Sequence, residues 1–222
     1  LIFPGQGSQS VGMGQELYKN FDLVKKIFKD ADEKLNYPIS KIILEGPEAD
    51  LKLTKNTQPA ILTISYSIFK IITQEFNVDL KKDFTFFAGH SLGEYTALAL
   101  SGYLTYSEAL KVIAIRGEEM QKAVEGSNTG MAAVLTSDME KTLEEINNLN
   151  SQDIEIWISN YNDASQIVVS GNNEDLEYIK LNPKSISSKR IVPLEVAGAF
   201  HSKVVSPAKI AVEKTLDEID IR

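Results

Sequence analysis

Apolar side chains recur at helical spacing along much of the first half of the chain. Residues 16–35 form an amphipathic pattern with a break expected near Phe21 and Asp22. Residues 59–76 are nearly continuously apolar and too long for a strand, so we expect a buried helix with Pro59 near its first turn. Residues 92–100 predict a helix that ends at Gly102.

A further amphipathic helix is predicted over residues 107–124, with Ser107 or Thr105 as its N-cap. Short apolar runs at residues 1–3 and 84–88 predict strands, and residues 79–83 form a charged link before the second of them. Strands therefore alternate with helices in this region, which is typical of an α/β domain.

The pattern changes after Gly126. Strands are predicted at residues 131–136, 154–160, 166–170 and 190–196, and helices at 137–149 and 172–181. Ser137, with Glu140 three residues later, is expected to cap the first of these helices. The order strand–helix–strand–strand–helix–strand is that of a ferredoxin-like module. We therefore expect a small α+β subdomain at residues 127–193, inserted into a larger α/β subdomain made of residues 1–126 and 194–222.

Composition narrows the possible functions. The chain of 222 residues has a formal charge of −8, which argues against broad nucleic-acid binding. It contains no cysteine, so disulfides, thiol nucleophiles and cysteine-based metal sites are excluded, and no metal site is expected. We see no apolar run of membrane-spanning length and no signal peptide. Because the chain starts without Met and ends without a closing element, we expect a fragment.

The strongest chemical signal is Gly89-His90-Ser91-Leu92-Gly93, which matches G-x-S-x-G. It stands between a predicted strand and a predicted helix, as the nucleophile turn of hydrolase-like folds requires. Glycines on both sides of such a turn avoid crowding by Cβ atoms, and the Leu92 amide at the helix start can stabilise an oxyanion. A simple glycine-flanked helix cap is the alternative.

The segment Pro4 to Gln9 is a second glycine-containing loop, directly after the first strand. A dinucleotide-binding fingerprint would need a third glycine where Ser10 stands, and a phosphate-binding P-loop would need Lys where Met13 stands. We interpret the segment as a loop whose Gln6 amide supplies a second oxyanion donor. A plain turn explains the spacing equally well.

A serine nucleophile needs a base, and the chain has only two histidines, His90 and His201. His90 adjoins Ser91 in a tight turn that directs the imidazole away from the hydroxyl, which leaves His201. No aspartate or glutamate stands out as its orienting group. Arg116, on the helix predicted at 107–124, is either a solvated surface residue or a bidentate clamp for a carboxylate.

These segments together resemble one family, the malonyl-CoA–acyl carrier protein transacylases, together with the related acyltransferase domains of polyketide synthases. The resemblance covers the whole chain in family order and rests on FPGQGSQ (3–9), TQPA (57–60), GHSLGE (89–94), RG and MQ (116–117 and 120–121), GAFHS (198–202), and the stretches NYN (160–162) and QIVVSG (166–171).

The resemblance implies a hydrolase-like parallel-sheet α/β domain with a ferredoxin-like insert. It implies a ping-pong transfer of malonyl from malonyl-CoA to the phosphopantetheine thiol of acyl carrier protein, in fatty acid biosynthesis, with Ser91 as nucleophile and His201 as base. The amides of Gln6 and Leu92 would form the oxyanion hole.

The resemblance also implies roles in substrate binding. Arg116 would bind the malonyl carboxylate. Phe200, His90 and Asn160 are also expected to bind the substrate, and Phe200 is typical of the malonyl-selective type. No cofactor is expected. The resemblance further implies that the C-terminal part of the large domain is missing, and the carbonyl that orients His201 is expected in that segment, after Arg222.

Two alternatives remain open at this stage: a serine hydrolase or thioesterase of the same fold, and an inactive binding module. We further expect a monomer located in the cytoplasm, or in a plastid or mitochondrion of a eukaryote. Neither nucleic acid nor a membrane is an expected partner. Lys189 and Arg190 are our provisional docking site for the carrier protein.

Overall fold

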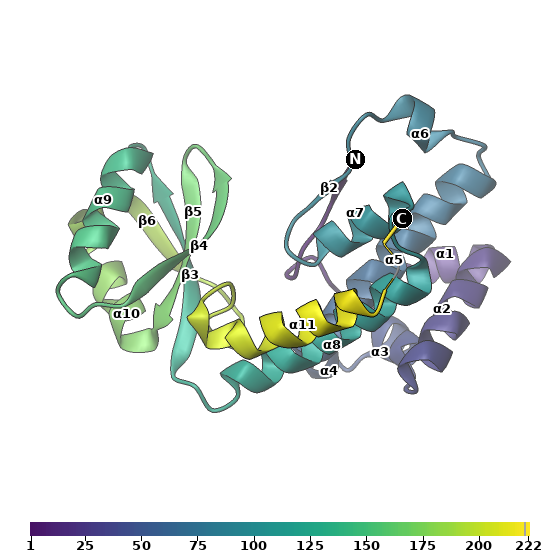
Figure 1. Cartoon of the computed structure of the whole chain (residues 1–222), viewed down its shortest axis with the longest axis horizontal. Helices are drawn as coiled ribbons and strands as arrows, with labels where there is room; N and C mark the ends of the chain where they lie inside the picture. The colour runs from purple at the N-terminus through teal and green to yellow at the C-terminus, as the bar shows by residue number, and fades with distance from the viewer. Residues whose placement is uncertain (220) are drawn as a thin grey trace. The chain divides into compact units, whose positions relative to one another are not determined.

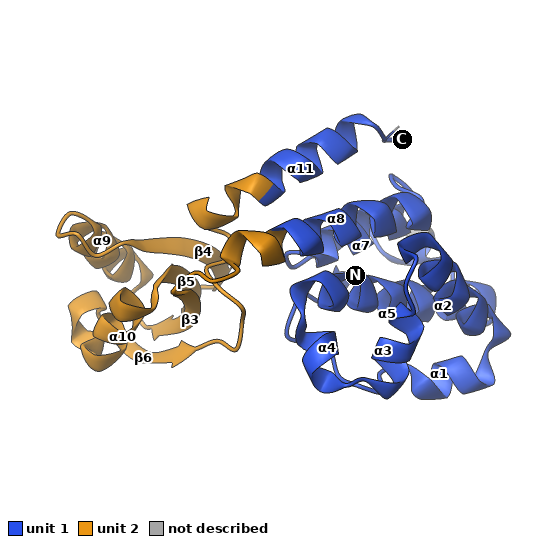
Figure 2. Cartoon of the chain, turned by 90° about the horizontal axis from the view of Figure 1, so that it is seen from below, with its two compact units in different colours: residues 1–119, 208–222 blue, residues 120–207 orange. Residues whose placement is uncertain are grey.

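The computed structural model describes residues 1–219 and 221–222, which form two compact units. Unit 1 consists of residues 1–119 and 208–222, and unit 2 of residues 120–207 (Figure 2). Unit 2 extends beyond the range predicted for the small subdomain because the end of one helix and the segment after its last strand group with its sheet. The sequence-based boundaries of the small subdomain, residues 127 and 193, therefore stay a prediction.

Unit 2 is built on one antiparallel four-stranded sheet with the order β4-β5-β3-β6. Its elements are β3 (Thr129–Thr136), α9 (Met139–Asn150), β4 (Ile156–Asp163), β5 (Gln166–Asn172), α10 (Asn173–Leu181), η1 (Pro183–Ile186), β6 (Ser188–Pro193) and η2 (Lys203–Val205). This order of elements and strands is that of a ferredoxin-like fold, as the sequence pattern predicts.

The core of unit 2 lies between this sheet and its two helices (Figure 1). Side chains alternate along a strand, so Ile167 and Val169 of β5 join the core that includes Ile146 of α9 and Ile179 of α10. The residues between them, Val168 and Ser170, are also buried and face the opposite side of the sheet. Both faces of β5 are therefore covered.

One predicted cap in this unit is wrong. The N-cap of α9 is Asp138, whose carboxylate accepts a hydrogen bond from the Lys141 amide at 3.1 Å, and Ser137 precedes it. Aspartate caps as well as serine does, so the pattern alone does not separate two adjacent candidates.

Unit 1 combines a short parallel sheet with helices (Figure 1). Its elements are β1 (Ile2–Phe3), α1 (Gln15–Asn20), α2 (Asp22–Leu35), α3 (Ile39–Glu45), α4 (Glu48–Lys52), α5 (Thr54–Gln74), α6 (Leu80–Asp83), β2 (Ala88–Gly89), α7 (Gly93–Ser101), most of α8 (Tyr106–Val124) and most of α11 (Ser206–Asp217). The boundary between the units falls within these last two helices, after residue 119 of α8 and before residue 208 of α11. Among the described residues, no helix is long and apolar enough to cross a lipid bilayer.

Several helix boundaries in unit 1 follow from the pattern. Phe21 is extended and separates α1 from α2, as expected. Gly102, with φ 96°, ends α7, and the Thr105 hydroxyl caps α8 by accepting from the Glu108 amide at 3.2 Å. Two expectations need correction, because α5 begins at Thr54 rather than near Pro59, and α3 and α4 had no predicted counterpart. Helices α3 and α4 are short, and the start of α5 is polar, so apolar periodicity is a weak signal in all three stretches.

The polar start of α5 is buried because its side chains bond to the backbone around α4. Asn56 donates to the Asp50 carbonyl at 2.8 Å, and the Thr57 hydroxyl donates to the Leu51 carbonyl at 2.5 Å. These bonds satisfy groups that would be costly to bury without partners. The helix then continues into the apolar core, where Leu62 packs with Leu110 and Ile113 of α8.

The parallel strands are shorter than predicted. Ile2 pairs with Ala88 and Phe3 with Gly89, so only the last residue of the predicted strand 84–88 is in β2. Phe86, with 79% of its surface exposed, lies outside the strand. A strand needs a neighbour for its backbone groups, and β1 offers only a two-residue partner.

The turn from β2 into α7 brings backbone segments unusually close together. A Cβ atom on Gly89 would lie 1.9 Å from the carbonyl carbon of Gly93, and one on Gly93 would lie 2.4 Å from the Phe3 carbonyl oxygen. Real Cβ contacts are not this short, so side chains are excluded at both positions. The two glycines of the Gly-x-Ser-x-Gly sequence are therefore a steric requirement of this turn.

We predict that Gly89→Ala lowers the free energy of unfolding by about 3 kcal/mol or more, because the clash is with backbone that cannot rotate away. Urea denaturation followed by circular dichroism measures the loss. Gly12→Ala is the control, since Gly12 has φ +83° but open space at its Cβ position. That variant should lose only about 1–2 kcal/mol from left-handed strain. Equal losses in the two variants would contradict the close-contact explanation.

Candidate active site

Ser91 lies at the centre of the turn between β2 and α7. Its φ of 52° is in the left-handed region, where a side chain other than glycine or asparagine is uncommon. The Gly93 amide donates to the His90 carbonyl at 2.9 Å, and the Glu94 amide donates to the Ser91 carbonyl at 3.2 Å. The strained serine is thus held by the first turn of the helix, as in the nucleophile turn of hydrolase-like folds.

The loop after β1 lies against this turn. The His90 amide donates to the Phe3 carbonyl at 3.0 Å, and a Cβ on Gly5 would lie 2.6 Å from Nδ1 of His90. The carboxyl ends of adjacent parallel strands meet at one edge of a sheet, which is why these two loops are neighbours. Gln6 and Ser91 therefore belong to adjacent loops of unit 1.

Two backbone amides at this edge, those of Gln6 and Leu92, are the predicted oxyanion donors. Among the residues that the structure describes, neither the Gln6 nor the Leu92 amide donates a hydrogen bond. Leu92 is fully buried, and it immediately precedes the first residue of α7. An amide at a helix start carries partial positive charge and suits an anionic oxygen.

Arg116 of α8 points at the serine. Its Nη2 donates to Oγ of Ser91 at 2.9 Å, and its Nη1 donates to Oε1 of Gln58 at 2.7 Å. The guanidinium carbon lies 5.7 Å from the centre of the Tyr95 ring. Of the two interpretations open from the sequence, the solvated surface residue is wrong, because Arg116 is half-buried against these three side chains.

The electrostatics agree with a cation held out of bulk water. Burial lowers the pKa of Arg116, and the neighbouring Tyr95 and Glu94 act in the opposite direction. Burial likewise raises the pKa of Tyr95, while Arg116 lowers it. Arginine stays protonated at neutral pH even when its pKa falls, so a positive charge stands beside the Ser91 hydroxyl.

The second histidine lies in unit 2, in the loop that follows β6. His201 is exposed and has φ 54°, while the two residues before it, Ala199 and Phe200, are buried. The Ser202 hydroxyl donates to the Ala199 carbonyl at 2.6 Å, and the Ala199 amide donates to Oγ1 of Thr129 at 3.1 Å. The imidazole is therefore carried on a loop whose backbone is tied to the unit 2 sheet.

The predicted site residues are divided between the two units. Unit 1 contains Gln6, His90, Ser91, Leu92 and Arg116, and unit 2 contains Asn160, Phe200 and His201. Asn160 is half-buried on β4, opposite Val168 of β5. The pairing of Ser91 with His201 stays a prediction.

The sequence analysis assigned no role to two residues that contact Arg116. Gln58 lies in TQPA, a stretch that was noted without a role, and Tyr95 is four residues after Ser91, one helical turn along α7. Helical spacing would have indicated Tyr95. Nothing in the sequence indicates that Gln58 bonds Arg116, since 58 residues separate them.

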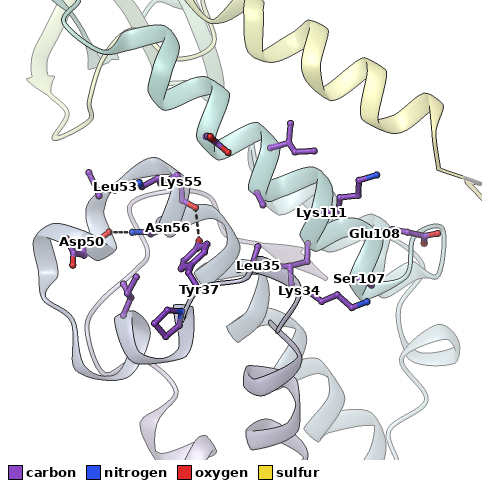
Figure 3. A pocket seen from close by; sticks show the side chains of 16 residues that line it. Lys34, Leu35, Tyr37, Asp50, Leu53, Lys55, Asn56, Ser107, Glu108 and Lys111 are labelled. Atoms are coloured by element: carbon purple, nitrogen blue, oxygen red, sulfur yellow. Dashed lines mark hydrogen bonds between the residues drawn. The ribbon is translucent and has the colours of Figure 1, made fainter. Parts of the chain in front are cut away.

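Unit 1 also contains a separate pocket of about 950 Å³ (Figure 3). Its lining includes Tyr37, whose hydroxyl donates to the Lys55 carbonyl at 3.4 Å, and Leu110 and Lys111 of α8. None of the predicted site residues lines it. One helix, α8, thus presents Arg116 to the serine and other residues to this pocket.

Comparisons with known proteins show the family of the chain. The Acyl transferase domain family matches residues 1–222. Malonyl CoA-acyl carrier protein transacylase of Bacillus subtilis (strain 168) is 39% identical over 221 residues, covering 100% of this chain and 68% of the relative.

Two solved structures are similar throughout. An acyl-carrier-protein-S-malonyltransferase from Bartonella henselae has a TM-score of 0.91 and 34% identity, over 99% of this chain and 69% of its own. A malonyl-transacylase in complex with its type II PKS acyl-carrier protein has a TM-score of 0.85 and 30% identity, over 100% of this chain and 70% of that one. The chain spans about two thirds of the length of these relatives. It belongs to the acyl transferase domain family and, within that family, to the malonyl-CoA–acyl carrier protein transacylases.

Proposed function

We propose that this chain transfers a malonyl group from malonyl-CoA to the phosphopantetheine thiol of acyl carrier protein, through a malonyl ester on Ser91. The observation that carries the proposal is the 2.9 Å bond from Arg116 to the Ser91 hydroxyl. A fixed guanidinium at that distance suits an acyl group with a free carboxylate, because planar, bidentate pairing with carboxylate is a property of arginine. Membership of the family supports the same substrate.

In the first half-reaction, Oγ of Ser91 attacks the thioester carbonyl of malonyl-CoA. His201 accepts the hydroxyl proton as the O–C bond forms, and the tetrahedral intermediate carries its negative charge on the former carbonyl oxygen. The amides of Leu92 and Gln6 donate to that oxygen, and the start of α7 adds favourable potential. The C–S bond then breaks, and the proton on His201 passes to the departing CoA thiolate.

The second half-reaction reverses these steps with a different thiol. His201 takes the proton from the phosphopantetheine thiol, and the sulfur attacks the malonyl ester on Ser91. The C–O bond breaks, Ser91 recovers its proton from His201, and malonyl acyl carrier protein leaves. The scheme is ping-pong because free coenzyme A departs before the carrier protein thiol reacts.

Selectivity for malonyl follows from two groups in this proposal. Arg116 exchanges its bonds to Ser91 and Gln58 for the carboxylate, which leaves acetyl without a charge partner for a half-buried cation. Phe200 adds bulk that disfavours an α-methyl group, by only about 1–3 kcal/mol. His90 and Asn160 complete the proposed substrate-binding set.

The carrier protein is the proposed partner, and its acidic surface needs a basic patch. Lys189 and Arg190 are exposed on β6 and remain our proposed docking residues. A structure of a similar transacylase in complex with its carrier protein supports this class of partner. A hydrolase of uncharged esters has no comparable need for a cation beside the serine, and so Arg116 argues against that alternative.

We predict that incubation with malonyl-CoA adds one malonyl group to the chain and that Ser91→Ala abolishes the adduct. Intact-mass spectrometry and peptide mapping locate the group, and added holo acyl carrier protein should remove it with formation of malonyl carrier protein. Ser8→Ala is a matched control, because Ser8 lies in the neighbouring loop and its hydroxyl, among the described residues, bonds only locally to the Gly5 carbonyl.

Three results would count against the proposal. An adduct that survives Ser91→Ala refutes the nucleophile. Release of free malonate at a rate independent of carrier protein supports the hydrolase. No adduct on the unmodified chain supports the inactive module.

We predict that Arg116→Ala lowers kcat/KM for malonyl-CoA by about 100-fold, since a charge-assisted bidentate pair is lost, and raises relative activity with acetyl-CoA. Arg116→Lys should recover the charge but only part of the rate, because an ammonium group lacks the planar fork. Steady-state rates with both thioesters measure the ratio. An unchanged malonyl-to-acetyl ratio in Arg116→Ala would assign the carboxylate to another residue.

A further inference from the structure

The carbonyl of Phe200 is held by two serine hydroxyls from the unit 2 sheet. Ser170 of β5 donates to Phe200 O at 2.6 Å, and Ser159 of β4 donates to it at 3.2 Å. The two hydroxyls also contact each other. Ser170 is fully buried, so its bond to the loop is shielded from water.

The local structure of the sheet is arranged to reach this carbonyl. Ser170 faces the side of β5 opposite Ile167 and Val169, away from the helix-covered core. Ser159 is an extra residue in β4, because Ile158 pairs with Val169 while Asn160 pairs with the adjacent Val168. Such a bulge changes the direction of a side chain and is frequent next to active sites.

The held carbonyl belongs to the same peptide plane as the amide of His201. A peptide unit is planar, so fixing the Phe200 oxygen also fixes the His201 nitrogen and the direction of the N–Cα bond of His201. His201 itself has φ 54°, a conformation that persists only where the surroundings enforce it. The peptide on the other side of Phe200 is fixed by the Ser202 hydroxyl, which donates to the Ala199 carbonyl.

We propose that Ser170, assisted by Ser159, is a positioning residue that sets the direction of the His201 imidazole. The inference rests on the proposed function for the role of His201, and it gives the QIVVSG stretch, which contains Ser170, a physical purpose. Ser170 has the larger effect, because its bond is shorter and more deeply buried. Each hydroxyl has one proton, so Ser159 either donates a second hydrogen bond to the Phe200 carbonyl or donates to the Ser170 oxygen and thereby orients the Ser170 hydroxyl.

The test compares Ser170→Ala, Ser159→Ala and the double variant with Ser185→Ala. Ser185 is a matched control in the same unit, since its buried hydroxyl has no hydrogen-bond partner among the described residues. Ser170→Ala should slow malonylation of Ser91 by malonyl-CoA about 10–100-fold, with KM little changed, because misplacement affects the chemical step rather than binding. Ser159→Ala should act in the same direction but less, and Ser185→Ala should stay within about threefold.

The double variant adds a sharper criterion. Two hydroxyls that act on one carbonyl are coupled, so the double variant should be little slower than Ser170→Ala alone. If the rate losses of the two single variants multiply in the double variant, each substitution damages the structure independently, and the inference is overturned. Thermal unfolding of each variant confirms that the unit is folded, and Ser159→Ala keeps the test open if Ser170→Ala fails to fold.

A second measurement does not depend on catalysis. The chain has only two histidines, so ¹³C-labelled histidine gives two imidazole signals, and His90 in unit 1 is an internal reference. Ser170→Ala should shift the His201 signal and leave that of His90 in place. Unchanged signals together with an unchanged malonylation rate would overturn the inference while leaving the proposed function intact. If the unmodified chain forms no adduct, the proposed function fails, and the His201 signal still reports on the positioning.

Discussion

The contact between the backbones of Gly89 and Gly93 is the constraint on which the serine site depends. It allows β2 to turn directly into α7, with the Phe3 carbonyl packed against the same point. Ser91 is consequently forced into a left-handed conformation that directs its hydroxyl out of the turn, and the Leu92 amide is left at the helix start. The proposed nucleophile and one proposed oxyanion donor thus arise from the same steric condition.

The charge of the site has a different origin. Helix α8 crosses the start of α5 closely, since a Cβ on Gly117 would lie 2.9 Å from the Thr54 carbonyl oxygen. That approach brings Arg116 within reach of Gln58 on α5 and of Ser91 after β2. The guanidinium is therefore positioned by packing between two helices, which suits its proposed role in binding an anionic acyl group.

The parts of this structure that depend on local pattern were predictable from the sequence. The interruption at Phe21, the end of α7 at Gly102, the ferredoxin-like order of unit 2 and the turn around Ser91 all follow from spacing and turn chemistry. The early start of α5 at Thr54 and the brevity of β2 were not, because each depends on a partner far along the chain.

The site shows the same division. Ser91 and Arg116 could be proposed from motifs, whereas the bonds from Gln58 to Arg116 and from Ser170 to Phe200 join residues 58 and 30 positions apart. The bulge at Ser159 has no signature in the amino-acid pattern, since it is a property of the pairing between β4 and β5. Long-range hydrogen bonds of this kind become visible only in three dimensions.

The central claim is that a single imidazole activates Ser91, and the rate of Ser91 malonylation in His201→Asn tests it most directly. Asparagine tolerates the left-handed backbone at position 201, where φ is 54°, so this change removes the base with little added strain. Rapid-quench mass spectrometry with malonyl-CoA should show malonylation slowed by about 10²–10⁴-fold, the usual contribution of a general base. Malonylation of Ser91 at the unmodified rate in His201→Asn would contradict the account.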